Sequence, residues 1–380
     1  MKYNETSLND ISEAIPRAQL APGYSIARVL NGLWQLSPGH SLTGALDMED
    51  IQYAFNKLVD YGFTTFDLAD IYIGAEDALG TFLRSLRSHS SLTPQDIQIH
   101  EKYVPDYDIL STVKFEDTQR IIDRSLKKLG RDYIDVIQYH WWDYNIDRYV
   151  DVAQNLVKLQ EQGKIRYIGV TNFDTEHMKA LVDGGIPVIS CQSQYSVFDH
   201  RVEKTMIEYG KAAGIQQICY GTLAGGLLSE RYMGSDRKNA NNNEQMSASL
   251  AQPETRSQVK YQQIIEASVG QDGYQELLVL LNDIAKSHDV HIAQIATRYI
   301  LDKEGVAATI IGIRNSKHVH DNAKIFSFDL SDYDRERIDN FLHQYPTVPG
   351  EPYELERDPH SIFRSIIRMN EAEGSSHASQ

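Results

Sequence analysis

The chain has 380 residues, of which 41% are hydrophobic and 24% charged, and its formal net charge is −16 at pH 7. This composition is typical of a soluble globular protein with one large domain or two smaller ones. The excess of carboxylates argues against partners that are nucleic acids or anionic membranes, because both bind clustered Lys and Arg. With two cysteines, no long apolar run and no apolar leader, the chain is predicted to be cytoplasmic and not membrane-bound.

Short apolar runs alternate with amphipathic helical patterns. The runs predicted to be strands are 27–34, 64–69, 97–103, 133–140, 166–171, 188–195, 215–221 and 307–313. Segments 47–61, 117–129 and 149–162 place apolar side chains on one helical stripe, and a glycine follows each of them. This repetition predicts an α/β fold, a single (β/α)8 TIM barrel, over a doubly wound sheet. Neither a Gly-x-Gly-x-x-Gly nor a P-loop motif occurs to support an open nucleotide-binding sheet.

The remaining segments fix the expected domain organisation. Residues 1–25 are predicted to be an irregular N-terminal segment, 26–345 the barrel, and 346–380 a C-terminal extension whose end is disordered. The Asn-rich segment 234–258 follows the seventh predicted strand. It therefore lies on the side where barrel active sites form, and it is predicted to be a mobile flap or a disordered insert.

Strand alternation selects the candidate catalytic residues. Asp67 lies in the second predicted strand, Tyr72 follows it, Lys102 lies at the end of the third strand and His140 at the end of the fourth. Polar side chains at the carboxyl ends of barrel strands line the mouth, where catalytic groups are found. An unperturbed tyrosine has a pKa of about 10, and a neighbouring ammonium lowers that pKa. The set therefore predicts carbonyl chemistry, with Tyr72 as proton donor and neutral His140 orienting the substrate oxygen.

The same alternation separates structural residues from candidates. Cys191 has the opposite parity to Gln192, and Cys219 the opposite parity to Tyr220. Both thiols are therefore predicted to pack beneath helices rather than to take part in chemistry. Glu101, directly before the candidate lysine, is predicted to face outward.

Each candidate also has a structural explanation when it is taken alone. Lys102 could be a solvated charge, Asp67 could cap the helix that begins near Ala75, and a lone His140 at a strand end is usually structural. The register of the whole set favours a catalytic role over these explanations.

Further motifs resemble the aldo/keto reductase family from about Arg28 to Asn322. Residues 66–72 resemble the family's Asp-x-Ala-x-x-Tyr element, and Lys102 and His140 close their strands as in its catalytic tetrad. Residues 169–173 are similar to its Gly-Val-Ser-Asn-Phe element.

The resemblance implies an extended nicotinamide dinucleotide across the barrel mouth. Thr171, Asn172 and Gln192 would hold the carboxamide and Tyr220 would stack on nicotinamide, while segment 219–226 would cradle the pyrophosphate. The implied cofactor-binding residues are Thr171, Asn172, Gln192, Tyr220, Gly221, Leu223, Gly225, Gly312, Arg314, Lys317, Asp321 and Asn322.

Departures from the family pattern bear on the choice of cofactor. Gly221-Thr222 replaces a Ser-Pro pair, and Gly312 and His318 stand where some members carry Lys and Arg. A 2′-phosphate contact would then rest on Arg314, with Lys317 beside it. The expected cofactor is NADP(H), with NAD(H) left open.

The function implied by the resemblance is an NAD(P)H-dependent oxidoreductase that transfers hydride between nicotinamide and a carbonyl or alcohol substrate, an aldehyde, ketone or aldose. Tyr72 is the expected proton donor, and Trp34 and Trp141 are expected to form part of the substrate wall. The substrate, the direction of reaction and the oligomeric state stay open.

Two other functions were weighed. One is a redox sensor resembling potassium-channel β-subunits, which bind cofactor and report to a partner. The other is a metal-dependent barrel hydrolase with Asp67, His100 and His140 as ligands, which is disfavoured because no predicted strand carries a closely spaced His pair; no metal is expected.

Overall fold

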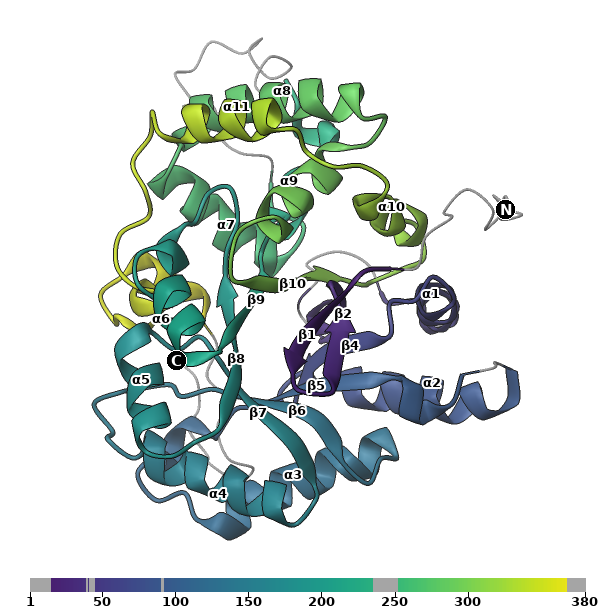
Figure 1. Cartoon of the computed structure of the whole chain (residues 1–380), viewed down its shortest axis with the longest axis vertical. Coiled ribbons are helices and arrows are strands. Elements are labelled where there is room, and N and C mark those ends of the chain that lie inside the picture. The colour runs from purple at the N-terminus through teal and green to yellow at the C-terminus, as the bar shows by residue number, and fades with distance from the viewer. Residues whose placement is uncertain (1–14, 39, 41–44, 90–91, 235–251, 368–380) are drawn as a thin grey trace.

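All eight predicted strands are present, and they close into a barrel. The computed structural model describes residues 15–38, 40, 45–89, 92–234 and 252–367 (Figure 1). The barrel order is β10-β3-β4-β5-β6-β7-β8-β9, with parallel pairing throughout. The strands are β3 (Val29–Gly32), β4 (Thr65–Ala69), β5 (Gln98–Tyr103), β6 (Ile134–Tyr139), β7 (Ile165–Thr171), β8 (Val188–Gln194), β9 (Gln216–Tyr220) and β10 (Val306–Gly312). The predicted (β/α)8 fold is thereby confirmed.

Helices surround this barrel (Figure 1). They are α1 (Met48–Asp60), α2 (Ala75–His89), α3 (Phe115–Leu129), α4 (Tyr149–Glu161), α5 (Thr175–Asp183), α6 (Met206–Ala213), α7 (Arg256–Ala267), α8 (Gly270–Ser287), α9 (Ile292–Leu301), α10 (Val319–Ala323), α11 (Asp332–Leu342) and α12 (Glu354–Arg357). Short 3₁₀ helices include η2 (Trp34–Leu36), η6 (Ala224–Gly226) and η10 (Ile362–Ile366). Among the described residues, no helix combines the length and apolar character needed to cross a bilayer.

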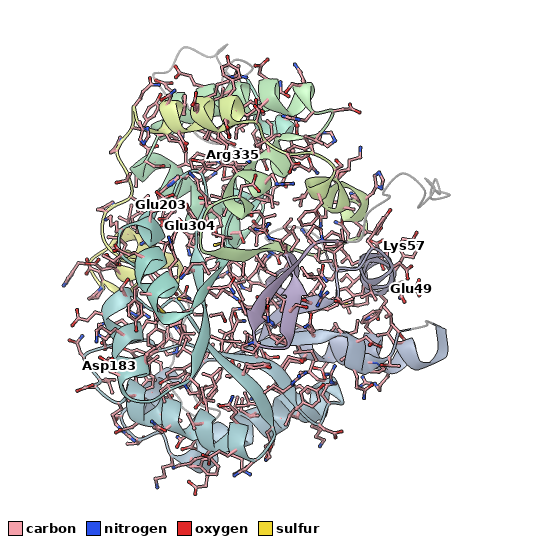
Figure 2. All side chains as sticks on the ribbon, viewed as in Figure 1. Glu49, Lys57, Asp183, Glu203, Glu304 and Arg335 are labelled. Atoms are coloured by element: carbon pink, nitrogen blue, oxygen red, sulfur yellow. The ribbon has the colours of Figure 1, made fainter. Side chains whose placement is uncertain are left out.

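Helix α3 shows how the sequence sets one of these elements. Its apolar stripe, including Ile121, Ile122 and Leu129, is buried against the barrel. The helix ends at Gly130, whose φ of 67° is the left-handed conformation that glycine adopts without steric cost. Charged side chains such as Glu49 on α1 and Asp183 at the end of α5 lie on the outer side of the helical layer (Figure 2).

Outward-facing strand residues form the main core beneath the helices. The rings of Phe55, Phe66 and Phe82 join α1, β4 and α2, with centroids 5.2 to 5.9 Å apart. Cys191 and Cys219 are free and buried in this layer, as predicted from their parity. Burial raises the pKa of the Cys191 thiol to about 12, so this thiol is kept in its unreactive protonated form.

The amino-terminal end of the barrel is covered by a hairpin that the sequence analysis missed. Part of the segment expected to be irregular forms β1 (Arg17–Ala21) and β2 (Tyr24–Ala27), which pair antiparallel around a turn at Gly23. The Tyr24 hydroxyl lies 3.0 Å from Nε2 of His100 inside the barrel. The hairpin is therefore packed into the barrel interior and closes this end. The rest of the predicted N-terminal segment, residues 1–14, lies outside the described residues.

The described part of the C-terminal extension returns to the barrel. Helix α12 and η10 follow α11, and η10 contacts α7. The buried carboxylate of Glu356 accepts hydrogen bonds from both terminal nitrogens of Arg201, at 3.0 and 3.1 Å. This pairing fixes the extension near the carboxyl ends of the strands. The predicted disordered end, 368–380, and most of the Asn-rich insert, 235–251, lie outside the described residues.

Candidate active site

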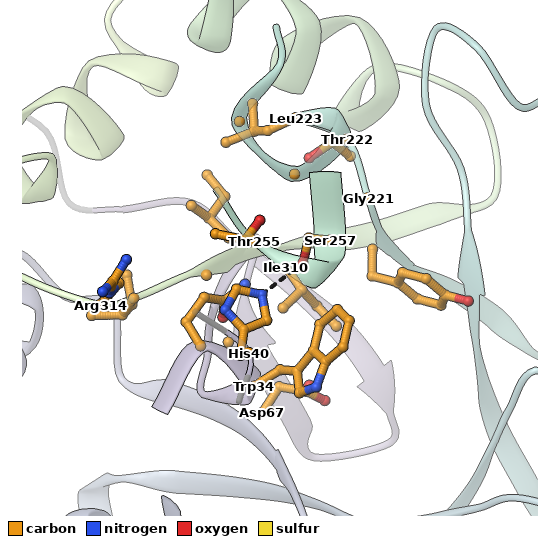
Figure 3. A pocket seen from close by; sticks show the side chains of 18 of the residues that line it. Trp34, His40, Asp67, Gly221, Thr222, Leu223, Thr255, Ser257, Ile310 and Arg314 are labelled. Carbon is orange, nitrogen blue, oxygen red and sulfur yellow. Dashed lines mark hydrogen bonds between the residues drawn. The ribbon is translucent and has the colours of Figure 1, made fainter. Parts of the chain in front are cut away.

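A cavity of about 880 Å³ lies at the carboxyl ends of the barrel strands (Figure 3). It brings together most of the residues selected from the sequence. Those that line it are Trp34, Asp67, Tyr72, Lys102, His140, Thr171, Asn172, Gln192, Tyr220, Gly221, Leu223, Gly225, Gly312, Arg314, Asp321 and Asn322. Residues from six barrel strands, and from loops that include those after β3 and β6, therefore converge on one site.

A buried ion pair lies at the base of this cavity. Strands β4 and β5 pair so that Ala69 lies opposite Lys102. The Lys102 ammonium donates to Oδ1 of Asp67 at 2.5 Å, and the two residues are 7% and 4% exposed. The same ammonium lies 3.3 Å from the carbonyl oxygen of Leu68. Parallel pairing of two neighbouring strands is therefore enough to hold the lysine beside its carboxylate.

The second carboxylate oxygen of Asp67 is held by two glutamine amides. Nε2 of Gln138 donates to Oδ2 at 2.8 Å, and Nε2 of Gln192 donates to it at 2.6 Å. Gln192 also lies 2.7 Å from Oε1 of Gln138. With Lys102, three side chains donate to one buried carboxylate, which fixes the lysine in place. Gln138 was missed as a site residue, although its parity with His140 was a signal for it.

Tyr72 follows β4 in a tight turn, and its amide donates to the carbonyl of Ala69 at 2.9 Å. The Lys102 ammonium lies 5.3 Å from the centroid of the Tyr72 ring. Burial raises the pKa of Tyr72 well above its usual value, and the carboxyls of Asp67, Glu101 and Asp70 raise it further. The expectation that the neighbouring lysine lowers this pKa is therefore wrong for the structure, because burial is the largest influence on it. The phenol keeps its proton at neutral pH.

His140 faces the cavity as a neutral ring. Burial lowers the pKa of His140 to about 3, and the Arg357 guanidinium acts in the same direction. Its Nδ1 lies 3.3 Å from the carbonyl oxygen of Thr171, which orients the imidazole. The rings of Trp142 and Tyr353 meet it edge-on, with centroids 4.6 and 5.6 Å away. The histidine is thus a fixed, uncharged group in the same cavity as the Asp67–Lys102 ion pair.

Two of the predicted residues lie outside the cavity. Trp141 is fully buried, and its indole N–H donates to the carbonyl oxygens of Asp143 and Ile146 at 2.8 and 3.1 Å. It follows His140 with the opposite orientation, so its neighbour Trp142 lines the cavity in its place. Lys317 is exposed and is absent from the cavity lining.

The disfavoured metal site is not assembled. His100 lies deep in the barrel, hydrogen-bonded to Tyr24. Across the residues that the structure describes, no cluster of three or more His, Cys, Asp or Glu side chains could hold a metal ion.

The residues expected to hold nicotinamide form an ordered set. The Tyr220 hydroxyl donates to Oδ1 of Asn172 at 2.7 Å, and Asn172 itself has a positive φ of 61°. Oγ1 of Thr171 and Oγ1 of Thr222 are buried without a hydrogen-bond partner in the structure. Both residues line the cavity. Such unpaired hydroxyls fit a polar ligand that supplies the missing hydrogen bonds.

The loop after β9 approaches helix α7 so closely that only glycine fits at two positions. A Cβ on Gly221, whose φ is +83°, would lie 2.3 Å from the Tyr261 hydroxyl. A Cβ on Gly225 would lie 2.9 Å from the backbone carbon of Ser257. The loop therefore presents its backbone to the cavity, as a pyrophosphate cradle requires.

Two arginines from distant parts of the sequence lie at another part of the cavity. Arg314 (Figure 3) follows β10 and Arg256 begins α7, and both line the cavity. His40 is hydrogen-bonded to the hydroxyl of Ser257 at 2.7 Å, and burial together with Arg314 and Arg256 lowers the pKa of His40 to about 4. These arginines fit the phosphate groups of a dinucleotide. Arg256 was missed, because its only signal is the Thr255 helix cap beside the polar insert.

Other cavity residues had no usable sequence signal. Lys260 and Tyr261 come from α7, and Tyr353 and Ile367 come from the C-terminal extension. The extension shows no motif that links it to the barrel. Its approach to the site depends on buried charges far apart in the sequence.

Comparison with known proteins shows the fold and the family. The model of the aldo/keto reductase family matches residues 28–343. Aldo-keto reductase YhdN of Bacillus subtilis (strain 168) is 25% identical over 345 residues, which are 87% of this chain and 94% of the relative. L-glyceraldehyde 3-phosphate reductase of Escherichia coli (strain K12) is 24% identical over 316 residues, 80% of this chain and 84% of that protein.

Solved structures agree on the fold. The glycerol dehydrogenase AKR11B4 from Gluconobacter oxydans has a TM-score of 0.66 at 21% identity, covering 90% of this chain and 99% of the other. An aldo/keto reductase from Klebsiella pneumoniae, solved with NADP and acetate, has a TM-score of 0.62 at 20% identity, covering 86% and 94%. Because the family model spans most of the barrel, the chain belongs to the aldo/keto reductase family of NADP(H)-dependent oxidoreductases.

Proposed function

We propose that this protein interconverts a carbonyl compound and its alcohol with NADP(H), and that Tyr72 exchanges the proton. The observation that carries the proposal is the position of the Lys102 ammonium, bonded to Asp67 and 5.3 Å from the Tyr72 ring in one cavity. His140 lines the same cavity.

Each residue has a distinct role in this proposal. When bound, the reduced nicotinamide supplies the hydride. Tyr72 holds its proton at neutral pH because burial raises its pKa, and it gives that proton to the oxygen of the substrate. The fixed Lys102 ammonium stabilises the negative charge that develops on the phenol oxygen, and neutral His140 orients the substrate oxygen without adding charge. General acid catalysis of this kind contributes roughly 10²–10⁴-fold in rate.

The residues present fit NADP(H). Thr171, Asn172 and Gln192 would bind the carboxamide and Tyr220 would face the nicotinamide ring. The carboxamide would contact Oε1 of Gln192, because Nε2 of Gln192 already donates to Asp67. The guanidiniums of Arg314 and Arg256 would bind the 2′-phosphate that distinguishes NADP from NAD, since planar guanidinium groups suit phosphate oxygens.

The substrate side of the cavity is largely aromatic. Trp34, Trp142 and Tyr353 line it. Aromatic walls favour small aldehydes, ketones or sugars that stack against a ring. The curated relatives include a methylglyoxal reductase and an L-glyceraldehyde 3-phosphate reductase, which suggests a small aldehyde.

The test is the Tyr72→Phe substitution. We expect turnover of aldehydes with NADPH to fall by about 10²–10⁴-fold, because the acid is lost. The dissociation constant of NADPH, measured by fluorescence titration, should stay unchanged. Tyr333→Phe, at an exposed position, is the matched control and should behave like the wild type.

Full turnover by Tyr72→Phe would contradict the assignment of the acid. Repeated turnover of simple aldehydes by the wild type separates this enzyme role from a protein that binds cofactor only to report redox state.

A further inference from the structure

A second buried lysine lines the cavity, and the proposed reaction does not use it. Lys260 lies on the first turns of α7 and is 6% exposed. Its ammonium lies over three tyrosine rings, 5.2 Å from the centroid of Tyr220, 5.7 Å from that of Tyr353 and 5.8 Å from that of Tyr261. The nearest carboxylate oxygen, on Glu356, is 3.6 Å away, which is longer than a hydrogen bond.

The carboxylate beside Lys260 is already shared with another cation. Glu356 accepts from both terminal nitrogens of Arg201, in a bidentate pair that is fully buried. Arg201 also donates to Asp199 at 2.8 Å. Arg201 therefore makes the closer contacts with the carboxylate of Glu356. The Lys260 ammonium has only a longer ion pair with that carboxylate, at 3.6 Å. A buried ammonium in this state gains from any further anionic acceptor.

One contact of Lys260 connects it to His140. Tyr353 packs against His140, with centroids 5.6 Å apart, and Lys260 lies over the same Tyr353 ring. The arginines suited to the cofactor phosphates, Arg256 and Arg314, instead surround His40. Asp67 accepts from Lys102 and two glutamines, so it is already neutralised towards an incoming anion.

We propose that the Lys260 ammonium binds an anionic group of the substrate, a carboxylate or a phosphate, while the carbonyl lies at Tyr72 and His140. Preferred substrates are therefore carbonyl compounds that carry a negative charge. This inference rests on the proposed function, because it specifies the substrate class of the same site. The competing explanation is that Lys260 only anchors the C-terminal extension through Glu356.

Matched aldehydes with and without the charge test the proposal. Succinic semialdehyde is compared with butanal, and glyceraldehyde 3-phosphate with glyceraldehyde, in NADPH-dependent steady-state assays. We expect the wild type to prefer the charged member of at least one pair, and the preferred pair identifies carboxylate or phosphate. Lys260→Met should lower kcat/KM for that charged aldehyde by about tenfold to a hundredfold, mainly through KM, because a hydrogen bond to a charged group is lost.

The controls separate recognition from folding. In Lys260→Met, the loss of kcat/KM should be larger for the charged aldehyde than for its neutral partner, and Lys260→Arg should restore most of the preference. Glu356→Gln removes the carboxylate that pairs with Arg201 and serves as the folding control. It should lower the midpoint of thermal unfolding and affect charged and neutral aldehydes alike, unlike Lys260→Met.

Several results would overturn the proposal. One is an equal loss of kcat/KM on charged and neutral aldehydes in Lys260→Met, as expected if this lysine only anchors the C-terminal extension. Another is a weaker NADPH dissociation constant in Lys260→Met, which would assign the ammonium to the cofactor. A wild type without preference for either charged aldehyde would also reject it. Failure of the proposed function is distinguishable, because none of the four aldehydes would then be reduced.

Discussion

Glu101 carries a carboxyl group in an apolar setting between the barrel and its helices. It stands beside Lys102 but faces outward, as its parity predicted, and its side chain is completely buried. Neither carboxyl oxygen has a hydrogen-bond partner in the structure. Burial raises the pKa of Glu101 well above its usual value, and nearby Glu76 and Asp70 raise it further. The group is therefore a neutral acid in the folded protein.

This protonation makes stability depend on pH. The unfolded chain releases the Glu101 proton near pH 4.5, whereas the folded chain keeps it until the raised pKa is reached. The contribution of Glu101 to stability is thus fully present below about pH 4.5 and is lost as the pH rises. Glu101→Gln carries no such proton. We expect Glu101→Gln to raise the free energy of unfolding at pH 8 and to raise it less at pH 5. The gain at pH 8 should be about 1.4 kcal/mol for each unit by which folding raises the pKa of Glu101.

Urea denaturation at the two pH values measures this difference. Glu336→Gln, at an exposed position on α11, is the control and should show no pH-dependent gain. A loss of stability at pH 8 in Glu101→Gln would show that the carboxylate makes a favourable interaction instead.

At the scale of elements, the short helix α12 joins the C-terminal extension to two loops at the cavity. Arg357 donates from Nη2 to the carbonyl oxygens of Trp141 and Asn172, at 2.9 and 2.7 Å. Its guanidinium also lies 4.2 Å from the centroid of the Tyr144 ring. The loops after β6 and β7, which carry His140 and Asn172, are therefore tied together by one side chain.

Arg357→Ala should loosen these loops. We expect a loss of about 2–3 kcal/mol of stability, because hydrogen bonds from a charged group and a ring contact disappear together. NADPH should also bind more weakly, since Asn172 is no longer held. Thermal denaturation and fluorescence titration measure the two effects. Arg337→Ala, which removes a surface ion pair with Asp283, should change neither by more than about 1 kcal/mol.

The elements also show how far the sequence predicts the structure. Strand alternation and glycine-terminated helices were sufficient for the barrel, because local patterns determine which face of each element is buried. The β1–β2 hairpin was missed, although Pro22-Gly23 is a turn signal and Gly23 has a φ of 73°. Two short strands carry too little periodicity to be found without that turn.

The candidate site likewise contains residues that the sequence could predict and residues that it could not. Asp67, Lys102 and His140 were predictable because barrel topology puts the ends of parallel strands together. Lys260 and Tyr353 were not, because their approach to the cavity depends on a buried ion pair between Arg201 and Glu356, and no local pattern encodes a contact over that distance along the chain. The pKa of Tyr72 was mispredicted for a similar reason, since burial outweighs the paired lysine.

At the scale of the whole molecule, buried phenols set a limit on alkaline stability. Burial raises the pKa of tyrosines distributed through the barrel and its surroundings: Tyr24, Tyr72, Tyr103, Tyr139, Tyr144, Tyr195, Tyr220, Tyr261, Tyr299 and Tyr353. The folded protein retains these protons above about pH 10, where the unfolded chain releases them. Stability contributed by these groups is present below that pH and is lost as the pH rises past it.

We therefore expect cooperative unfolding in alkali, with tyrosinate absorbance rising in the same step in which near-ultraviolet circular dichroism is lost. A free tyrosine derivative in the same buffers gives the unperturbed midpoint. Gradual titration of most tyrosines at that midpoint, with the circular dichroism intact, would contradict the burial of these phenols.

The order of elements along the chain has a consequence for biosynthesis. The barrel closes when β10 pairs with β3, but Tyr353 and Ile367 line the cavity from a segment that follows much later. A chain still being made on the ribosome can therefore complete its eight-stranded ring before its pocket has a finished wall. The residues that complete the pocket are thus synthesised after the last strand of the barrel.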